Sequence, residues 1–264
     1  MIEASEASSG PDRIISLAPS ITELCGALGL ADRLVGRTQF CTYPPSVVNV
    51  PIVGAYTDTN LEAILAAKPD LVLVTASSPK LESKLRALDL PVKVLPDSSY
   101  EDVFEAIREL GGVTQRPLTA RRLIDNLEAD MARLEQPPAA HKRVLLVTGP
   151  MPIPATGLHV AGPGSVLDRF LQLAGCENAM AGRLERPWAR ISVEQVLAAN
   201  PDIIIETRDP ADEAHHDALY RAWSPIAAVN ALRHRRIRTL PRWIELPGPR
   251  INVILYRIVV AVRD

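Results

Sequence analysis

Four aromatic side chains are the residues of this sequence best suited to binding a ligand. Tyr43, Tyr56, Trp188 and Trp243 each fall in or beside a predicted loop, close to proline or glycine, in a chain with only 4% aromatic residues. Flat rings in loops at the carboxyl ends of strands suit a large, partly apolar small molecule. The alternative is that each ring packs its loop against its own domain. Their spacing leaves both interpretations open.

Two glutamates occupy equivalent positions in an internal repeat. Residues 60–74 (NLEAILAAKPDLVLV) and 192–206 (SVEQVLAANPDIIIE) align without a gap, which places Glu62 and Glu194 at the same point near the start of two predicted helices. The helix dipole stabilises a carboxylate there by roughly 0.3–1 kcal/mol, which is a sufficient structural reason. The functional alternative is a matched pair of exposed charges that docks on two basic sites of a symmetric partner.

The other residue types point away from catalysis and metal binding. The sequence contains no nucleotide-binding glycine motif and no G-x-S-x-G, and none of its five histidines is spaced from a second histidine or a cysteine as a zinc site requires. The segment GPGS at 162–165 is interpreted as a helix entry turn rather than an anion cradle. His159 falls in a loop rich in proline and glycine, where solvent exposure is expected and ligand contact is the alternative. We therefore expect no catalytic residue, no metal site and no intrinsic cofactor.

The composition is that of a folded protein that does not bind nucleic acid. The chain has 264 residues, 47% of them hydrophobic, and a net charge of −2 without a basic patch. Its apolar runs are shorter than the roughly 20 residues that a membrane span needs. Three cysteines cannot all pair, and Cys25 and Cys176 are predicted to be thiols in the core.

Short aliphatic strands alternate with amphipathic helices, which predicts parallel α/β units. Because the repeat occurs twice, we predict an α/β fold of two Rossmann-like lobes with central parallel sheets and a cleft between them. One long helix is expected to join the lobes rigidly, so that opening of the cleft is small. The predicted parts are a disordered or non-native N-terminal segment 1–12, an N-terminal lobe 13–115, a linking helix 116–137 and a C-terminal lobe 138–264.

The individual elements follow from the same periodicities. Strands are expected at 13–16, 34–36, 71–74, 92–95, 143–148, 203–205 and 237–240, and helices, besides those of the repeat, at 20–28, 79–88, 100–110, 212–223 and 249–262. Ser20 is expected to cap its helix and Gly111-Gly112 to follow the end of another. Residues 149–165 are expected to form a loop.

In this order and spacing, the segments resemble the periplasmic substrate-binding proteins of ABC importers that have a single-helix hinge, the class that handles cobalamin, haem and siderophores. The resemblance runs from about Arg13 to Val262, on RIISLAPSITEL, CTYPP, NLEAILAAKPDLVLV, GPGSVLDRFLQLAGCENA, RPWARISVEQVLAANPDIII and PGPRI. Within the class, the chain is most similar to the cobalamin-binding branch. The resemblance implies a protein that is not an enzyme and that captures cobalamin in the cleft between its lobes.

The resemblance also assigns ligand-binding positions. Tyr43, Tyr56, Trp188 and the loop Arg242–Glu245, which contains Trp243, match the corrinoid-contacting positions of that branch. The branch often has tryptophan in place of Tyr56, and it can have an acidic and a basic residue where this chain has Arg242 and Leu246. His159 falls where an aromatic contact can occur. Since Tyr56 or His159 could ligate haem iron, haem and a ferric siderophore are the alternative ligands.

The class also implies the partners. Its docking glutamates map onto Glu62 and Glu194, one in each lobe, so the resemblance favours docking on the permease dimer of an ABC transporter over capping alone. It implies a monomer that binds a small-molecule metal chelate, and a periplasmic or extracellular lipid-anchored location, with the signal segment absent from this sequence.

Two functions of other classes remain as alternatives. One is an enzyme acting in the cleft, such as a nucleotide-sugar transferase, which would need a nucleotide loop or a catalytic dyad. The other is a cytoplasmic corrinoid or metal chaperone.

Overall fold

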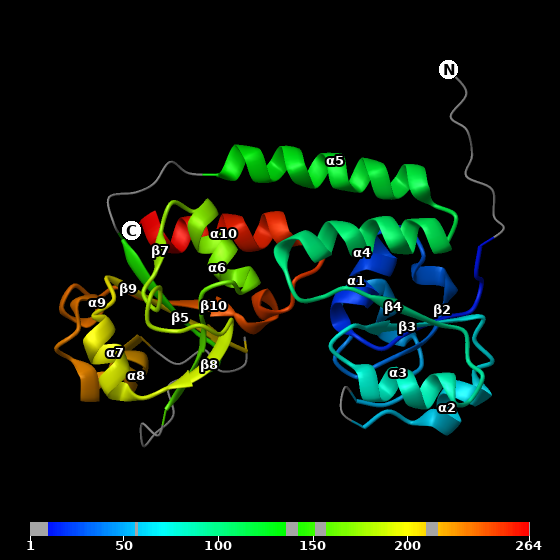
Figure 1. The fold of residues 1–264 in the computed structure, drawn as a ribbon, viewed down its shortest axis with the longest axis horizontal. Coiled ribbons are helices and arrows are strands. Elements are labelled where there is room, and N and C mark those ends of the chain that lie inside the picture. Colours follow the sequence, from blue (N-terminus) through cyan, green and yellow to red (C-terminus); the bar gives the residue numbers. More distant parts are fainter. Residues whose placement is uncertain (1–9, 56–57, 136–141, 151–156, 210–215, 264) are drawn as a thin grey trace. The chain divides into compact units, whose positions relative to one another are not determined.

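The chain forms two compact units, each built on its own β-sheet (Figure 1). The computed structural model describes residues 10–55, 58–135, 142–150, 157–209 and 216–263. Unit 1 comprises residues 1–129 and 246–249, and unit 2 comprises 130–245 and 250–264. In the described residues, no helix is both long and apolar enough to cross a membrane.

Unit 1 contains a parallel sheet of four strands in the order β2-β1-β3-β4. The strands are β1 (Ile14–Ser16), β2 (Leu34–Arg37), β3 (Leu71–Thr75) and β4 (Val92–Leu95). The helices are α1 (Pro19–Ala27), α2 (Leu61–Ala66), α3 (Pro79–Arg86) and α4 (Tyr100–Val113), with short 3₁₀ turns η1 (Ala31–Arg33) and η2 (Pro45–Asn49). All residues of β1 and β3 are buried, as expected of parallel strands covered on both faces.

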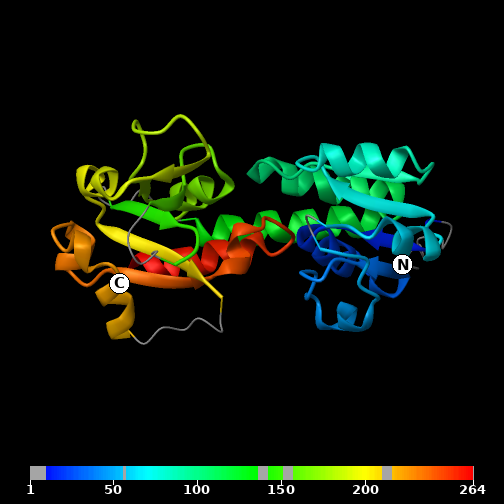
Figure 2. The same ribbon diagram turned by 90° about the horizontal axis from the view of Figure 1, so that it is seen from below.

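Unit 2 contains a mixed sheet in the order β10-β9-β5-β6-β8, with β7 paired to β5. The strands are β5 (Arg143–Val147), β6 (Leu158–Ala161), β7 (Glu177–Asn178), β8 (Trp188–Ile191), β9 (Ile203–Arg208) and β10 (Ile237–Pro241). Strands β5, β9 and β10 are parallel, and β9 and β10 lie side by side in yellow and orange in Figure 2. Its helices include α6 (Val166–Leu173), α7 (Val193–Ala199), α8 (His216–Ala222), α9 (Asn230–Arg233) and α10 (Ile251–Arg263), with 3₁₀ turns η4 (Ser224–Ile226) and η5 (Arg242–Glu245).

The prediction of a parallel sheet is therefore right for unit 1 and wrong for part of unit 2. Strand β6 is antiparallel to both β5 and β8. Only residues 148–157 separate β5 from β6, and a parallel connection needs a crossover of about a dozen residues or more. The segment 149–165 is consequently not one loop, and His159 lies on strand β6.

Helix α5 (Pro117–Leu134) is continuous across the boundary between the units, which falls after residue 129. It lies within the predicted linking helix 116–137, whose last residues, 136 and 137, are outside the described residues. The predicted helix 212–223 is described only from His216, as α8, and ends at Ala222.

Two helix ends differ from the predictions for local reasons. Helix α1 begins at Pro19, where the fixed φ of proline suits the first helical position, so Ser20 lies inside the helix and does not cap it. Helix α4 continues through Gly111 and Gly112 to Val113. A Cβ atom on Gly111 would lie 2.4 Å from the Cβ atom of Ala120 on α5, so this glycine permits close packing of two helices instead of ending one.

The internal repeat forms the same local structure twice. Asn60 caps α2 by accepting a hydrogen bond from the amide of Ala63, and Ser192 caps α7 in a capping box with Gln195. Lys68 and Asn200 follow the two helices with φ of +46° and +43°, a left-handed conformation that ends each helix.

The aspartates of the two Pro-Asp turns connect neighbouring strands. Asp70 accepts hydrogen bonds from the amides of Asp12 and Arg13, and Asp202 accepts one from the amide of Arg143, each at 2.9 Å. Each carboxylate thus satisfies a backbone donor at the start of the unit's first strand. The Pro-Asp pair is repeated because both sheets start in the same way.

The cysteines are buried as free thiols. Cys25 and Cys176 lie in the cores of their units, as predicted, and Cys41 is buried too. Burial raises the pKa of the Cys25 thiol to about 12, so it is not a reactive thiolate.

The contact between Gly111 and Ala120 gives a test with a neighbouring control. We expect Gly111→Ala to destabilise the protein by about 1–3 kcal/mol, the usual cost of overpacking. Gly112→Ala should instead stabilise it by about 0.5–1 kcal/mol, because nothing lies within 4 Å of the added methyl group and alanine favours the helix. Thermal unfolding of both variants measures this, and equal shifts in the same direction would contradict it.

Candidate ligand-binding site

In unit 1, the loop that follows β2 exposes two aromatic rings. Tyr43 and Phe40 are both large exposed hydrophobic side chains of this loop, and the loop starts at the carboxyl end of a parallel strand, where ligands of open α/β sheets bind. The sequence indicated Tyr43 through its CTYPP motif. It did not indicate Phe40, although a second aromatic residue three positions earlier in an aromatic-poor chain was an available signal. Tyr56 lies outside the described residues.

A buried arginine fixes this loop. Arg37, the last residue of β2, is 5% exposed, and its guanidinium donates to the carbonyl oxygens of Val47 at 2.9 Å, Val48 at 2.6 Å and Thr38 at 3.2 Å. These bonds satisfy a charge that would otherwise be costly to bury. Arg37 therefore holds the loop that exposes Tyr43, a positioning role that the sequence analysis missed.

A hollow lies beside the carboxyl end of β3. Its volume is about 480 Å³, within the range of small-molecule pockets, and its lining includes Ser77, Ser78, Lys80 and Lys84. The two lysines are exposed and their ammonium groups can bind an acidic group, but Asp58 also lines the hollow and the Ser77 hydroxyl donates to Asp97. No sequence motif marked these residues.

In unit 2, the register of β6 and β8 brings His159 and Trp188 to one face. His159 is paired with Arg190 and Trp188 with Ala161, so His159 and Trp188 occupy diagonal positions of the antiparallel pair, whose Cα atoms are typically roughly 7–8 Å apart. Both side chains are exposed. The carbonyl oxygen of His159 accepts a hydrogen bond from the amide of Thr148, which places His159 beside the carboxyl end of β5.

The turn η5 follows the carboxyl end of β10 and contains Arg242 and Trp243. Arg242 is exposed and forms loose ion pairs with Asp209 at 3.9 Å and Glu245 at 3.8 Å. Trp243 is half-buried, and the guanidinium of Arg250 lies 3.9 Å from its ring centroid. One face of this indole is thus already occupied by a cation. Trp243 is therefore less available to a ligand than Trp188.

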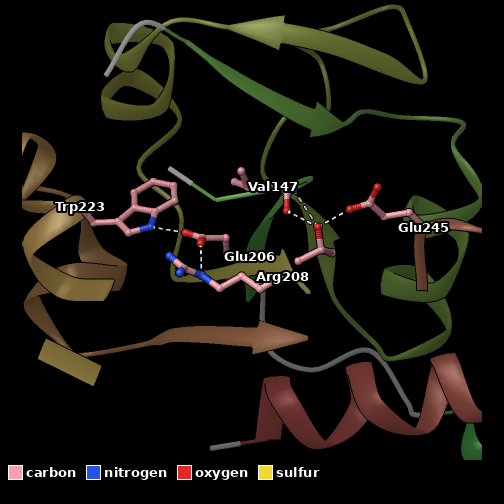
Figure 3. A network of polar contacts seen from close by, with 7 residues as sticks. Val147, Glu206, Arg208, Trp223 and Glu245 are labelled. Carbon is pink, nitrogen blue, oxygen red and sulfur yellow. Dashed lines mark hydrogen bonds and ion pairs between the residues drawn. The ribbon is translucent and has the colours of Figure 1, made fainter. Parts of the chain in front are cut away.

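Glu245 attaches this turn to the sheet. The hydroxyl of Thr207 on β9 donates to Glu245 and lies 3.4 Å from the carbonyl oxygen of Val147. Dashed lines in Figure 3 mark these contacts of Glu245 and Val147. The amide of Gly149 donates to the same hydroxyl at 2.8 Å. Burial raises the pKa of Glu245, against the lowering effects of the Thr207 hydrogen bond and of Arg242.

A second carboxylate of unit 2, that of Glu206 on β9, is fully buried. Glu206 accepts a hydrogen bond from the indole nitrogen of Trp223 at 2.6 Å and forms an ion pair with Arg208 (Figure 3). Trp223 is itself buried in the core of unit 2. These partners satisfy the buried charge within the unit, so the cluster organises the end of β9.

The two repeat glutamates are both exposed. Glu62 lies in the first turn of α2 and Glu194 in the first turn of α7. A hydrogen bond from Ser192 lowers the pKa of Glu194. In the described residues, no three His, Cys, Asp or Glu side chains converge on a position that could hold a metal ion.

Comparison with known proteins identifies the class. A family model described as periplasmic binding protein matches residues 14–242. The chain belongs to this family. Its members bind small molecules for transport and catalyse no reaction, as the sequence predicts.

Three similar proteins are informative about ligands. The vitamin B12-binding protein of Pectobacterium carotovorum is 29% identical over 247 residues, covering 91% of this chain and 84% of its own. The crystal structure of the vitamin B12 binding protein BtuF of Vibrio cholerae has a TM-score of 0.76 and 25% identity, covering 96% of this chain and 97% of its own. The structure of the periplasmic haem-binding protein RhuT of Roseiflexus sp. RS-1 has a TM-score of 0.81 and 28% identity, and the match covers 96% of this chain and 98% of RhuT.

The chain is thus a substrate-binding protein of the ABC importer class, as the sequence predicted. Proteins of this similarity include binders of vitamin B12 and of haem. The family therefore establishes the kind of function.

The raised pKa of Glu245 gives a pH-dependent test. A carboxyl group whose pKa is raised by folding contributes stability that is fully present below its unfolded pKa, about 4.5, and is lost as the pH rises through the folded pKa. Glu245→Gln removes that loss. We therefore expect the melting temperature of the variant relative to wild type to increase between about pH 4 and about pH 7.

Differential scanning fluorimetry at several pH values measures this difference. Glu185→Gln, which removes an exposed carboxylate of the same unit, is the control. A difference that stays constant with pH, or that falls as the pH rises, would contradict the assignment.

Proposed function

We propose that this protein captures cobalamin and delivers it to the permease dimer of an ABC importer. The observation that supports cobalamin is the set of exposed rings, with Tyr43 and Phe40 in the loop after β2 of unit 1 and Trp188 on the edge strand β8 of unit 2. A corrinoid is large and partly apolar. Aromatic rings offer it a large contact area, and ordering them costs little conformational entropy. The vitamin B12-binding relatives support the same choice.

The remaining ligand groups follow from this proposal. Arg242 in η5 and Tyr56 would contact polar substituents of the corrin ring. Trp243 would contact the ligand with the part of its indole that Arg250 does not cover. His159 lies on the same face of the sheet as Trp188 and would contact the same ligand. We propose that the protein acts as a monomer in the periplasm or anchored by a lipid outside the cell, where the permease is accessible.

One observation favours haem as the second candidate. The exposed imidazole of His159 lies diagonally from Trp188, so a macrocycle resting on the indole would place a metal within reach of a histidine ligand. The haem-binding neighbour at 28% identity agrees with this alternative.

Titration calorimetry with cobalamin and with haem tests the ligand. We expect tight one-to-one binding of cobalamin, and we expect Trp188→Ala to weaken it by about 1–3 kcal/mol, the usual range for a lost aromatic anchor. Tyr256→Ala removes an exposed ring from α10 and should leave the affinity unchanged. Tight haem binding without cobalamin binding would overturn the choice of cobalamin.

We further propose that Glu62 and Glu194 dock the protein on the permease. Each lies on the exposed side of a short, capped helix, in the same position of the repeat. A permease dimer presents two equivalent surfaces, and two equivalent carboxylates suit two equivalent basic groups. Capping accounts for a carboxylate at one helix start, but the repetition on two exposed helices favours a partner with twofold symmetry.

Charge reversal tests the docking role. The double variant Glu62→Lys, Glu194→Lys should bind cobalamin with wild-type affinity and lose most cobalamin uptake, because like charges oppose each other at both contacts. Glu101→Lys with Glu185→Lys reverses one exposed glutamate per unit at other positions and should support uptake. Normal uptake by the first variant would rule the docking role out.

A further inference from the structure

Each repeat helix exposes a leucine one turn after its glutamate. Leu65 on α2 is 43% exposed, and Leu197 on α7 is 40% exposed. They are equivalent residues of the repeat, three positions after Glu62 and Glu194 respectively. Side chains three positions apart on a helix lie on the same face, so each helix presents a carboxylate and an isobutyl group together.

The core does not account for these leucines. The residue that anchors each helix in its unit is the one before the leucine, Ile64 in α2 and Val196 in α7, and both are fully buried. Leu65 and Leu197 therefore face outward, where a polar side chain would serve the fold equally well.

The two copies of the repeat differ at other positions of these helices. Asn60 corresponds to Ser192, Ala63 to Gln195 and Lys68 to Asn200. The exposed glutamate, the exposed leucine and the two alanines that follow the leucine are the same in both copies, and the leucine is the large apolar side chain among them. Two large apolar side chains at equivalent exposed positions are more than the isolated exposed leucine that any protein surface contains.

We propose that Leu65 and Leu197 form the apolar half of the docking surface, beside Glu62 and Glu194. This inference rests on the proposed docking function and adds the chemistry of the partner. The permease dimer must present, at each of two equivalent positions, a cationic side chain next to an apolar recess. The carboxylate directs approach and orientation, while burial of the leucine contributes affinity that salt does not screen.

The two helices in Figure 1, α2 and α7, suit this role because both are held firmly. Asn60 caps one and the Ser192–Gln195 capping box fixes the other, and each helix packs on its core through its buried aliphatic residue. Docking therefore requires little ordering of the surface, which lowers the entropic cost of binding.

The test measures binding to the permease complex with which the wild-type protein supports cobalamin uptake, held in lipid nanodiscs. We expect Leu65→Ala with Leu197→Ala to weaken this binding by roughly tenfold, with cobalamin affinity and melting temperature close to wild type. The weakening should be the same at low and at high salt, whereas the effect of Glu62→Lys with Glu194→Lys should decrease as salt is added. Leu88→Ala with Val260→Ala truncates one exposed aliphatic residue per unit elsewhere and should bind normally.

The outcomes separate this inference from the docking proposal. If charge reversal abolishes binding and the leucine variant binds as wild type does, the leucines have no role and only this inference fails. If both variants bind as wild type does, the docking proposal fails with it. Self-association of the wild-type protein that the leucine variant loses would assign the surface to a second copy of this chain and overturn the inference.

Discussion

Burial of the central strands on both faces is the constraint on which the rest of each unit depends. In β3 and in the first five residues of β9, every side chain is buried, so these strands have no surface on which a ligand could rest. Groups that meet a ligand or a partner must therefore lie in the loops at the strand ends, on edge strands or on the helices that cover the sheets. Tyr43 and Trp243 lie beyond strand ends, Trp188 lies on the edge strand β8, and the repeat glutamates lie on helices.

Positions at strand ends are useful only if the loops are held in place, and each unit achieves this with a different buried polar group. In unit 1, the guanidinium of Arg37 binds three carbonyl oxygens of the loop that exposes Tyr43. In unit 2, Thr207 links the turn η5 to β9 through Glu245. Both arrangements fix the backbone before a ligand arrives, which reduces the ordering that binding would otherwise require.

The sequence was sufficient for most of the elements and for the class, because hydrophobic periodicity and the repeat are local signals, but it did not predict the strands β6, β7 and β8. It placed β4 at its observed bounds and predicted two sheets from one doubled segment. It was wrong where a long-range contact decides the outcome. Gly111 continues a helix because Ala120 packs against it, and His159 lies on a strand because β6 pairs with β5 and β8. The roles of Arg37 and Thr207 could not be predicted, since their partners are backbone atoms or side chains that only the fold brings near.

The outer position of β8 in its sheet bears on self-association. An edge strand offers unpaired backbone groups to other chains, and a bulky apolar residue such as Trp188 at that edge increases the tendency to aggregate. Strand β8 is only four residues long, and it carries Arg190 two residues after the tryptophan. A short strand with a cationic side chain disfavours the addition of a further strand. The edge can thus expose an indole for recognition without becoming a template for fibril growth.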